Sequence, residues 1–84
     1  MGKAEKPEKL AEKLRRIRFK LGLSQTEMAE ALERHGMKLY RSYISFYEND
    51  IRVPPFLVVL AYAKLVKIPS DVLIDDKRDL PKGF

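Results

Sequence analysis

The residues best suited to specific chemistry are short polar side chains repeated along residues 41–49. At about 100° per residue, Ile44 and Tyr47 share one helical face, which we expect to pack inward. The opposite face carries small polar groups, one aromatic ring and an amide: Arg41 at its start, then Ser42, Ser45, Phe46 and Asn49. Such groups can hydrogen-bond to base edges and phosphates. The alternative is that Ser42 and Ser45 are ordinary surface residues.

A predicted helix over residues 24–33 precedes this segment. Ser24 can accept a hydrogen bond from the backbone N–H of Glu27, and Glu27 can reach back to Ser24, which makes a capping box. The apolar residues of this helix recur on one face: Met28, Ala29 and Leu32. Gly36 is expected to end it, because a residue without Cβ suits the left-handed stop position. The two helices are thus joined by a turn.

Another amphipathic helix is predicted from Pro7 to Leu21, where Gly22 ends it. Its apolar stripe is Leu10, Leu14, Ile17 and Leu21. Its charged side carries Lys9, Lys13, Arg16 and Lys20, interspersed with glutamates. This side is either a solvated face or a source of phosphate contacts through its cations.

Arg18 differs from these cations because it lies near the apolar stripe, beside Leu14 and Leu21. An arginine in such a position needs a carboxylate partner. Glu48, on the inner face of its own helix, is the candidate. We therefore predict an ion pair between Arg18 and Glu48.

The second half of the chain predicts two more helices. Arg52 lies in a loop over residues 50–54, and Pro54–Pro55 then starts a helix that is apolar nearly all round through residues 56–63. One face of that helix must meet the core, and the other is suited to a second subunit. Ser70 or Asp71 caps a final turn with three apolar residues: Val72, Leu73 and Ile74.

The domain organisation follows from these elements. No segment carries a strand pattern, so we expect an all-α fold of five helices. Residues 1–6 are expected to be a flexible basic leader, residues 7–76 the domain, and residues 77–84 a tail that is flexible or bound by a partner.

Composition narrows the class of partner. The net charge is +5, and residues 1–20 hold eight Lys or Arg against three Glu, which favours a polyanionic partner. There is no cysteine, which fits the reducing cytoplasm, and no apolar run approaches the roughly 18 residues of a membrane span.

Enzymatic chemistry finds no support in the sequence, and we expect no cofactor. There is no nucleophile–base pair, no cluster of metal ligands and no glycine-rich phosphate loop. His35, the single histidine, is read as a surface residue near a helix end. A cap and solvated acids account for Asp71, Asp75 and Asp76 better than paired acid chemistry does.

Three stretches carry a family likeness: LRRIRFKLGLSQTEMAEAL, then YISFYEN, then RVPPFLVVLA. In this order they resemble the lambda-repressor-like helix-turn-helix domains of the Cro/repressor or XRE type, over about residues 10–75. The resemblance implies a five-helix fold, with Gln25–Glu33 as the positioning helix and Arg41–Asn49 as the recognition helix in the major groove of DNA.

The resemblance also assigns roles to residues. It implies that Gln25 and Asn49 contact phosphate, and that Arg41, Ser42 and Phe46 face the bases. It implies that Arg18 and Glu48 form the family's internal ion pair. Tyr43, Ser45 and Arg52 complete the predicted DNA-contacting set; the Tyr43 hydroxyl can reach a phosphate, although its ring can equally serve for packing.

The chain departs from the family pattern over residues 33–40. This connection is longer by about five residues than the usual four, and Tyr40 supplies no standard helix cap. Either the positioning helix is extended or the turn is enlarged, with Met37 and Leu39 as small anchors. Phe46 is also unusual, and it could pack on a thymine methyl group or against protein.

Two functions of different classes remain. The first is a sequence-specific regulator of transcription that binds double-stranded DNA, as a homodimer on a near-palindromic operator; antitoxin-type autoregulation, with a protein partner on the tail, is a variant. The second is a protein-interaction adaptor that uses Tyr40, Tyr43 and Phe46 as its patch. A steep salt dependence would favour DNA binding.

Overall fold

The computed structural model describes residues 7–84, and all the regular secondary structure in that range is helical. The helices are α1 (Leu10–Leu21), α2 (Gln25–Glu33), α3 (Arg41–Glu48), α4 (Phe56–Val66) and α5 (Ser70–Ile74). The predicted all-α fold of five helices is confirmed. The predicted leader over residues 1–6 lies outside the described residues.

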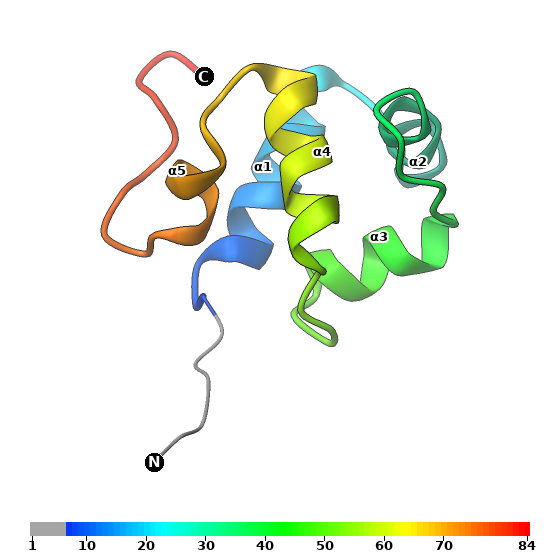
Figure 1. Ribbon diagram of the computed structural model, residues 1–84, viewed down its shortest axis with the longest axis horizontal. Helices are drawn as coiled ribbons and strands as arrows, with labels where there is room; N and C mark the ends of the chain where they lie inside the picture. Colours follow the sequence, from blue (N-terminus) through cyan, green and yellow to red (C-terminus); the bar gives the residue numbers. More distant parts are fainter. Residues whose placement is uncertain (1–6) are drawn as a thin grey trace.

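The helices are arranged around α1 and α4. Figure 1 shows α2 and α3 on one side of this pair, and α5 with the end of the chain on the other side. α3 packs against both α1 and α2, α4 packs against α2 and α5, and α1 packs against α5. The helix with the polar outer face is therefore fixed from two directions.

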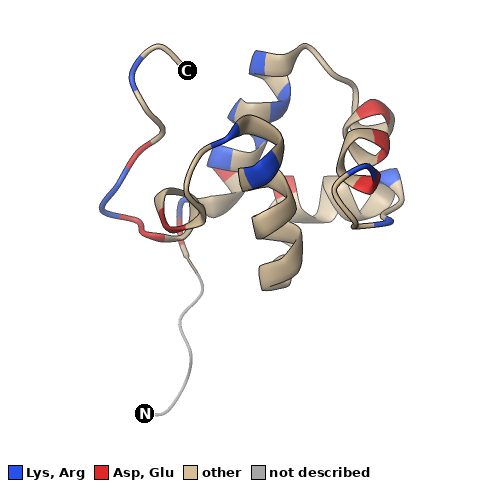
Figure 2. Ribbon diagram, turned by 45° about the horizontal axis from the view of Figure 1, so that its top comes forward, with Lys and Arg blue, Asp and Glu red and all other residues tan. Residues whose placement is uncertain are grey.

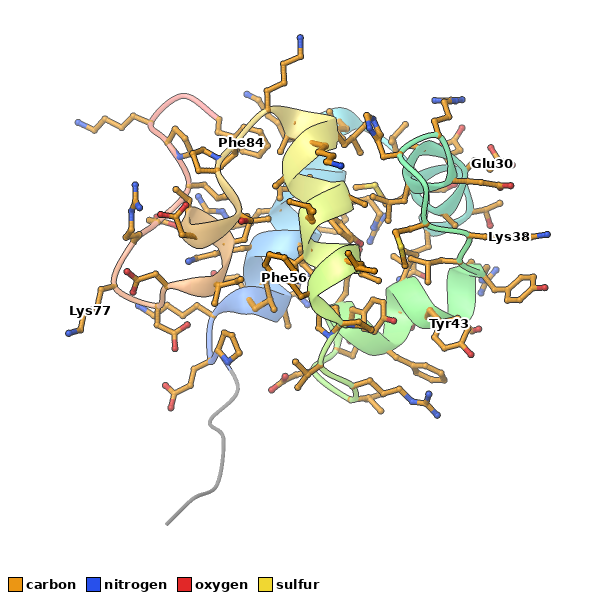
Figure 3. All side chains as sticks on the ribbon, viewed as in Figure 1. Glu30, Lys38, Tyr43, Phe56, Lys77 and Phe84 are labelled. Atoms are coloured by element: carbon orange, nitrogen blue, oxygen red, sulfur yellow. The ribbon has the colours of Figure 1, made fainter. Side chains whose placement is uncertain are left out.

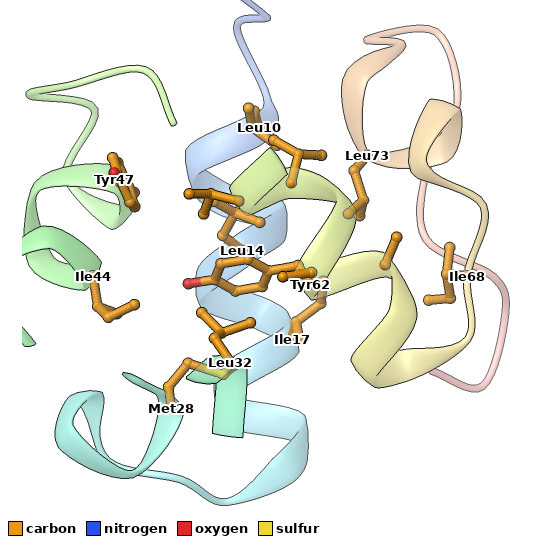
Figure 4. Close-up of a cluster of buried hydrophobic side chains, with 14 of the residues drawn as sticks. Leu10, Leu14, Ile17, Met28, Leu32, Ile44, Tyr47, Tyr62, Ile68 and Leu73 are labelled. Carbon is orange, nitrogen blue, oxygen red and sulfur yellow. The ribbon is translucent and has the colours of Figure 1, made fainter. Parts of the chain in front are cut away.

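One apolar cluster joins the helices (Figure 4). Its largest fully buried apolar members come from all five helices: Leu14, Ile17, Met28, Leu32, Ile44, Val58, Tyr62 and Leu73. The Tyr62 hydroxyl is buried with no hydrogen-bond partner among the described residues, and this burial raises its pKa. The cluster includes Ile44 of α3, so packing of the core sets the orientation of that helix.

Two glycines take the left-handed conformation predicted for helix ends. Gly22 has φ 71° after α1, and the next N–H donates to the Arg18 carbonyl at 3.2 Å. Gly36 has φ 94° in the turn after α2, and the Met37 N–H donates to the Leu32 carbonyl at 3.2 Å. These bonds satisfy carbonyls that a helix end would otherwise leave unpaired.

The predicted start of α1 at Pro7 is wrong, because the helix begins at Leu10. The Asp76 carboxylate accepts hydrogen bonds from the backbone N–H groups of Glu8 and Lys9, at 2.9 and 3.0 Å. A carboxylate from the far end of the chain thus caps α1, and residues 7–9 lead into the helix rather than belonging to it. Hydrogen bonds from these amides hold the pKa of Asp76 below its usual value.

Lys13 is a second correction, because it is buried rather than placed on the charged side. Its ammonium donates to the carbonyl oxygens of Val72, Asp75 and Arg78, at 2.7, 2.9 and 2.6 Å. Two of these carbonyls belong to the end of α5 and the residue after it, so the ammonium acts as a C-terminal cap supplied by another helix. Burial lowers the pKa of Lys13, and the surrounding carboxylates oppose that shift.

Residues 77–84, for which the sequence favours a tail, lie against the domain in the structure. Arg16 pairs with Asp79 at 2.8 Å on the surface of α1. Leu80 is buried, and Phe84 is packed against the core. Residues 79–84 are thus held against the domain by charge and by apolar contact.

Candidate nucleic-acid interface

α3 presents the predicted polar face to the surface. Ile44 is 0% exposed and Tyr47 is 5% exposed, whereas Arg41, Ser42 and Asn49 are exposed. Tyr43, Ser45 and Phe46 are half-buried. Figure 3 shows Tyr43 at the outer side of α3, away from the core. Inward and outward residues are thus divided as the helical period requires.

A buried ion pair connects α1 to the inner side of α3. Arg18 donates from Nε to Oε2 of Glu48 at 2.7 Å and from Nη2 to Oε1 at 2.9 Å. The Arg18 side chain is 12% exposed and the Glu48 side chain 2% exposed. Each charge has lost most of its water, and its attraction to the other charge offsets that desolvation cost. The hydrogen bond to Glu48 raises the pKa of Arg18. Arg18 also donates to the Leu23 carbonyl at 3.0 Å, which joins the α1–α2 turn to the pair.

Gln25 is the first residue of α2, and its side chain is linked to the same carboxylate. Its Nε2 donates to Glu48 Oε1 at 3.4 Å, which is a long and therefore weak hydrogen bond. Gln25 is half-buried and stands at the N-terminal end of the helix, where backbone N–H groups favour an anion. The Gln25 amide therefore lies near α3 and is held there only by a weak hydrogen bond.

The predicted capping box at the start of α2 is present. The Ser24 hydroxyl accepts from the Glu27 N–H at 3.1 Å, and the Glu27 carboxylate accepts from the Ser24 N–H at 2.8 Å. This box fixes where α2 begins, and with it the position of Gln25.

An aromatic and cationic cluster forms at the C-terminal half of α3. The rings of Tyr43 and Phe46 meet edge to face, with centroids 6.3 Å apart. The Arg52 guanidinium lies 5.1 Å from the Phe46 centroid and 6.0 Å from the Tyr43 centroid, within range of a cation–π contact. The sequence predicts Tyr43, Phe46 and Arg52 as separate DNA-contacting residues, and the structure brings their side chains together. The sequence does not predict that the turn after α3 folds Arg52 back over the helix.

Asn49 and Ser45 are close to each other on the outer face. The Asn49 amide donates to the Ser45 carbonyl at 2.8 Å and to the Ser45 hydroxyl at 3.3 Å. These contacts hold Asn49 at the end of α3 and leave it exposed. A ligand that accepts a hydrogen bond from the Asn49 amide must compete with its hydrogen bonds to Ser45.

The sequence left open whether the long connection between α2 and α3 extends the first helix or enlarges the turn. α2 ends at Glu33, so the turn is enlarged and the helix is not extended. Residues 37–40 have no regular secondary structure, and Met37 and Leu39 are packed against the core as the predicted anchors. Tyr40 precedes α3 without a capping side chain, and its ring is 67% exposed.

Charge is distributed unevenly over the helices. Figure 2 shows Lys and Arg along α1 and at the C-terminal end of α4, and Asp and Glu on α2. Between residues 7 and 84, no group of three or more His, Cys, Asp or Glu side chains is placed to hold a metal ion. No helix in this part of the chain has both the length and the apolar character needed to cross a membrane.

Comparison with known protein families matches residues 11–77 to the family described as "Helix-turn-helix domain". No curated protein and no solved structure matches the chain. The matched residues run from the first turn of α1 to the residues after α5, and so include the ion pair and the whole of α3.

Proposed function

The chain belongs to the lambda-repressor-like helix-turn-helix family, and from this premise we propose that it is a sequence-specific DNA-binding regulator of transcription. The observation that carries the proposal is the orientation of α3. Ile44 and Tyr47 are buried, whereas Arg41, Ser42 and Asn49 are exposed. With this orientation α3 can enter the major groove as a recognition helix.

The outer face of α3 divides into residues for bases and residues for phosphates. Arg41, Ser42 and Phe46 face the bases, with Ser45 and Tyr43 at the edges of the contact. The half-buried Phe46 ring suits the 5-methyl group of thymine, which is the apolar feature of the major groove. Each good base contact is worth about 1–3 kcal/mol of discrimination.

Phosphate contacts flank this face and orient the helix. Gln25 at the N-terminus of α2 and Asn49 at the end of α3 donate to phosphates, and Arg52 adds a charge that its aromatic neighbours already hold in place. If Arg52 neutralises one phosphate, this contact alone gives the plot of log K against log salt a slope of about −0.9 for each copy.

The regulator acts as a homodimer on a near-palindromic operator. The two-fold symmetry of the protein is then matched by that of the site, with half-sites one helical turn, about 34 Å, apart. This arrangement doubles the number of base contacts, and it predicts that two copies of the chain bind each duplex.

Selection of bound duplexes from a random library, with the stoichiometry measured on the winner, tests this function. Replacing single thymines of the winner by deoxyuridine, which lacks the 5-methyl group, should then weaken binding at one position of each half-site. Phe46→Ala should remove that sensitivity, whereas Phe46→Leu, which keeps an apolar side chain, should retain part of it. If all duplexes bound equally, base readout by α3 would be refuted.

A protein-interaction adaptor, including an antitoxin that holds a toxin, is a second candidate. The exposed Tyr40 and the pair of Tyr43 and Phe46 rings favour it, because such side chains can bind an apolar partner. A partner of residues 77–84 would have to replace the present burial of Leu80. Binding to this surface should be nearly independent of salt, in contrast to the slope expected for DNA.

A further inference from the structure

The enlarged turn between α2 and α3 carries positive charge on its outer side. It covers residues 34–40, whereas the turn of a helix-turn-helix motif usually has about 3–4 residues. No acidic residue occurs from residue 34 to residue 47, but three exposed cations do: Arg34, Lys38 and Arg41. The extra residues of this turn therefore add charge directly before the recognition helix.

The turn holds its exposed side chains in fixed positions. Met37 and Leu39 pack against the core, and the residues between and after them, Lys38 and Tyr40, are exposed. This alternation is that of extended backbone, and Tyr40 has φ −94° and ψ 159°. Figure 3 shows the Lys38 side chain directed away from the domain. Two anchors thus place two polar ends outward before any partner binds, which lowers the entropy cost of binding.

These two polar ends have no role within the fold. In the part of the chain from residue 7 to residue 84, no ion pair or hydrogen bond involves the Lys38 ammonium or the Tyr40 hydroxyl. The Tyr40 ring is 67% exposed, so it adds little to the core. Both groups are donors of the kind that bind phosphate oxygens in protein–DNA complexes.

We propose that the enlarged turn is a second DNA-contacting element, in which the Lys38 ammonium and the Tyr40 hydroxyl bind the phosphate backbone beside the bases that α3 contacts. This inference rests on the proposed function, since it assumes that α3 lies in the major groove. It assigns to this chain two contacts that come from the residues by which its turn exceeds the usual length.

The reach of the turn fits this position. The major groove is about 12 Å wide, so its phosphate walls lie roughly 6 Å from a helix at its centre. Lys38 precedes the first residue of α3 by three positions, which places its Cα at most ~10 Å from that of Arg41. Lys38 and Tyr40 are thus at the distance of a groove wall, whereas Arg41 and Ser42 are near the bases.

The test measures the affinity of Lys38→Gln and Tyr40→Phe for the selected duplex over a range of salt concentrations. Lys38→Gln should weaken binding several-fold and make the plot of log K against log salt shallower by about 0.9 for each copy. The loss should be the same on a duplex with scrambled half-sites, because phosphate contacts carry no sequence information. Tyr40→Phe should weaken binding several-fold without changing the slope, because it removes no charge.

Lys77→Gln is the matched control, because it makes the same change at an exposed lysine. Figure 3 shows Lys77 and Lys38 on opposite sides of the domain. This variant should keep the affinity and the slope of the wild type. Thermal melting checks that each variant is folded.

Neutral methylphosphonate groups, placed one at a time in the duplex, locate the contact. The wild type and Lys77→Gln should lose affinity when one phosphate beside each half-site is replaced, and Lys38→Gln should be insensitive to that replacement. A phosphate whose replacement weakens all three proteins equally is not bound by Lys38.

The outcomes separate this inference from the proposed function. If Lys38→Gln had the same slope as Lys77→Gln, Lys38 would be an ordinary solvated cation and the contact of the turn would be overturned, while preference for the selected duplex would leave the proposed function intact. An unchanged affinity of Tyr40→Phe would overturn the hydroxyl contact. A wild-type chain that prefers no duplex would overturn the proposed function and this inference with it.

Discussion

Replacing Arg18 by alanine should destabilise the fold itself. The substitution leaves the Glu48 carboxylate 2% exposed without its bidentate partner, and it removes the bond to the Leu23 carbonyl. Breaking a buried pair in this way costs about 3–5 kcal/mol. A domain of 84 residues has a total stability of roughly 4–13 kcal/mol, so the variant should lose a large share of it. At about 4–8 °C per kcal/mol, Tm should fall by at least ~12 °C.

Urea denaturation followed by circular dichroism measures this loss. Arg16→Ala is the matched control, because it removes the same side chain from the same helix and from an ion pair of similar length with Asp79. That pair is exposed, with side chains 42% and 71% accessible, so its loss should cost about 0–1 kcal/mol. The double variant Arg18→Met with Glu48→Met should recover much of the lost stability, because no unpaired buried charge remains. Equal midpoints for Arg18→Ala and Arg16→Ala would refute the reasoning.

Four further changes test other contacts. Gln25→Ala should weaken DNA binding several-fold and leave Tm nearly unchanged, since its bond to Glu48 is long; a large fall in Tm would make Gln25 structural. Lys13→Met should lower the free energy of unfolding in urea by about 2 kcal/mol, because three carbonyl groups lose a charged donor. An unchanged urea midpoint would show that the Lys13 ammonium does not stabilise the fold. Tyr62→Phe should keep or raise stability by up to ~1 kcal/mol, because it deletes a buried hydroxyl without a partner; a clear loss would reveal a hydrogen bond. Folding lowers the pKa of Asp76, so its contribution to stability is present above about pH 4 and is lost as pH falls further. Asp76→Asn should therefore reduce the fall in Tm at acidic pH, measured by thermal melting at a series of pH values. An unchanged dependence of Tm on acidic pH would contradict the capping role of Asp76.

Local patterns predicted most of the fold. The helical period placed Ile44 and Tyr47 inward, and the left-handed glycines and the capping box placed the helix ends, since all of these depend on neighbours within one or two turns. The Arg18–Glu48 contact could be inferred because both residues stand on apolar faces, where an unpaired charge is costly.

Features that depend on distant segments could not be predicted. Lys13 belongs to the charged side of α1 by period, and it is buried because α5 and residues 75–78 cover it. The start of α1 depends on Asp76, about 70 positions away in the sequence. The meeting of Arg52 with Phe46 depends on the turn after α3, whose direction the residue types alone do not specify.

The Lys13 ammonium has a consequence for biosynthesis. Its carbonyl partners include that of Arg78, which lies 65 residues later in the chain. While a ribosome is still adding the last helix, the nascent α1 keeps a charged amine that must stay hydrated, and the apolar residues beside it cannot close over fully. The complete set of bonds to this amine therefore requires residue 78, and we expect a chain that stops before that residue to be less stable.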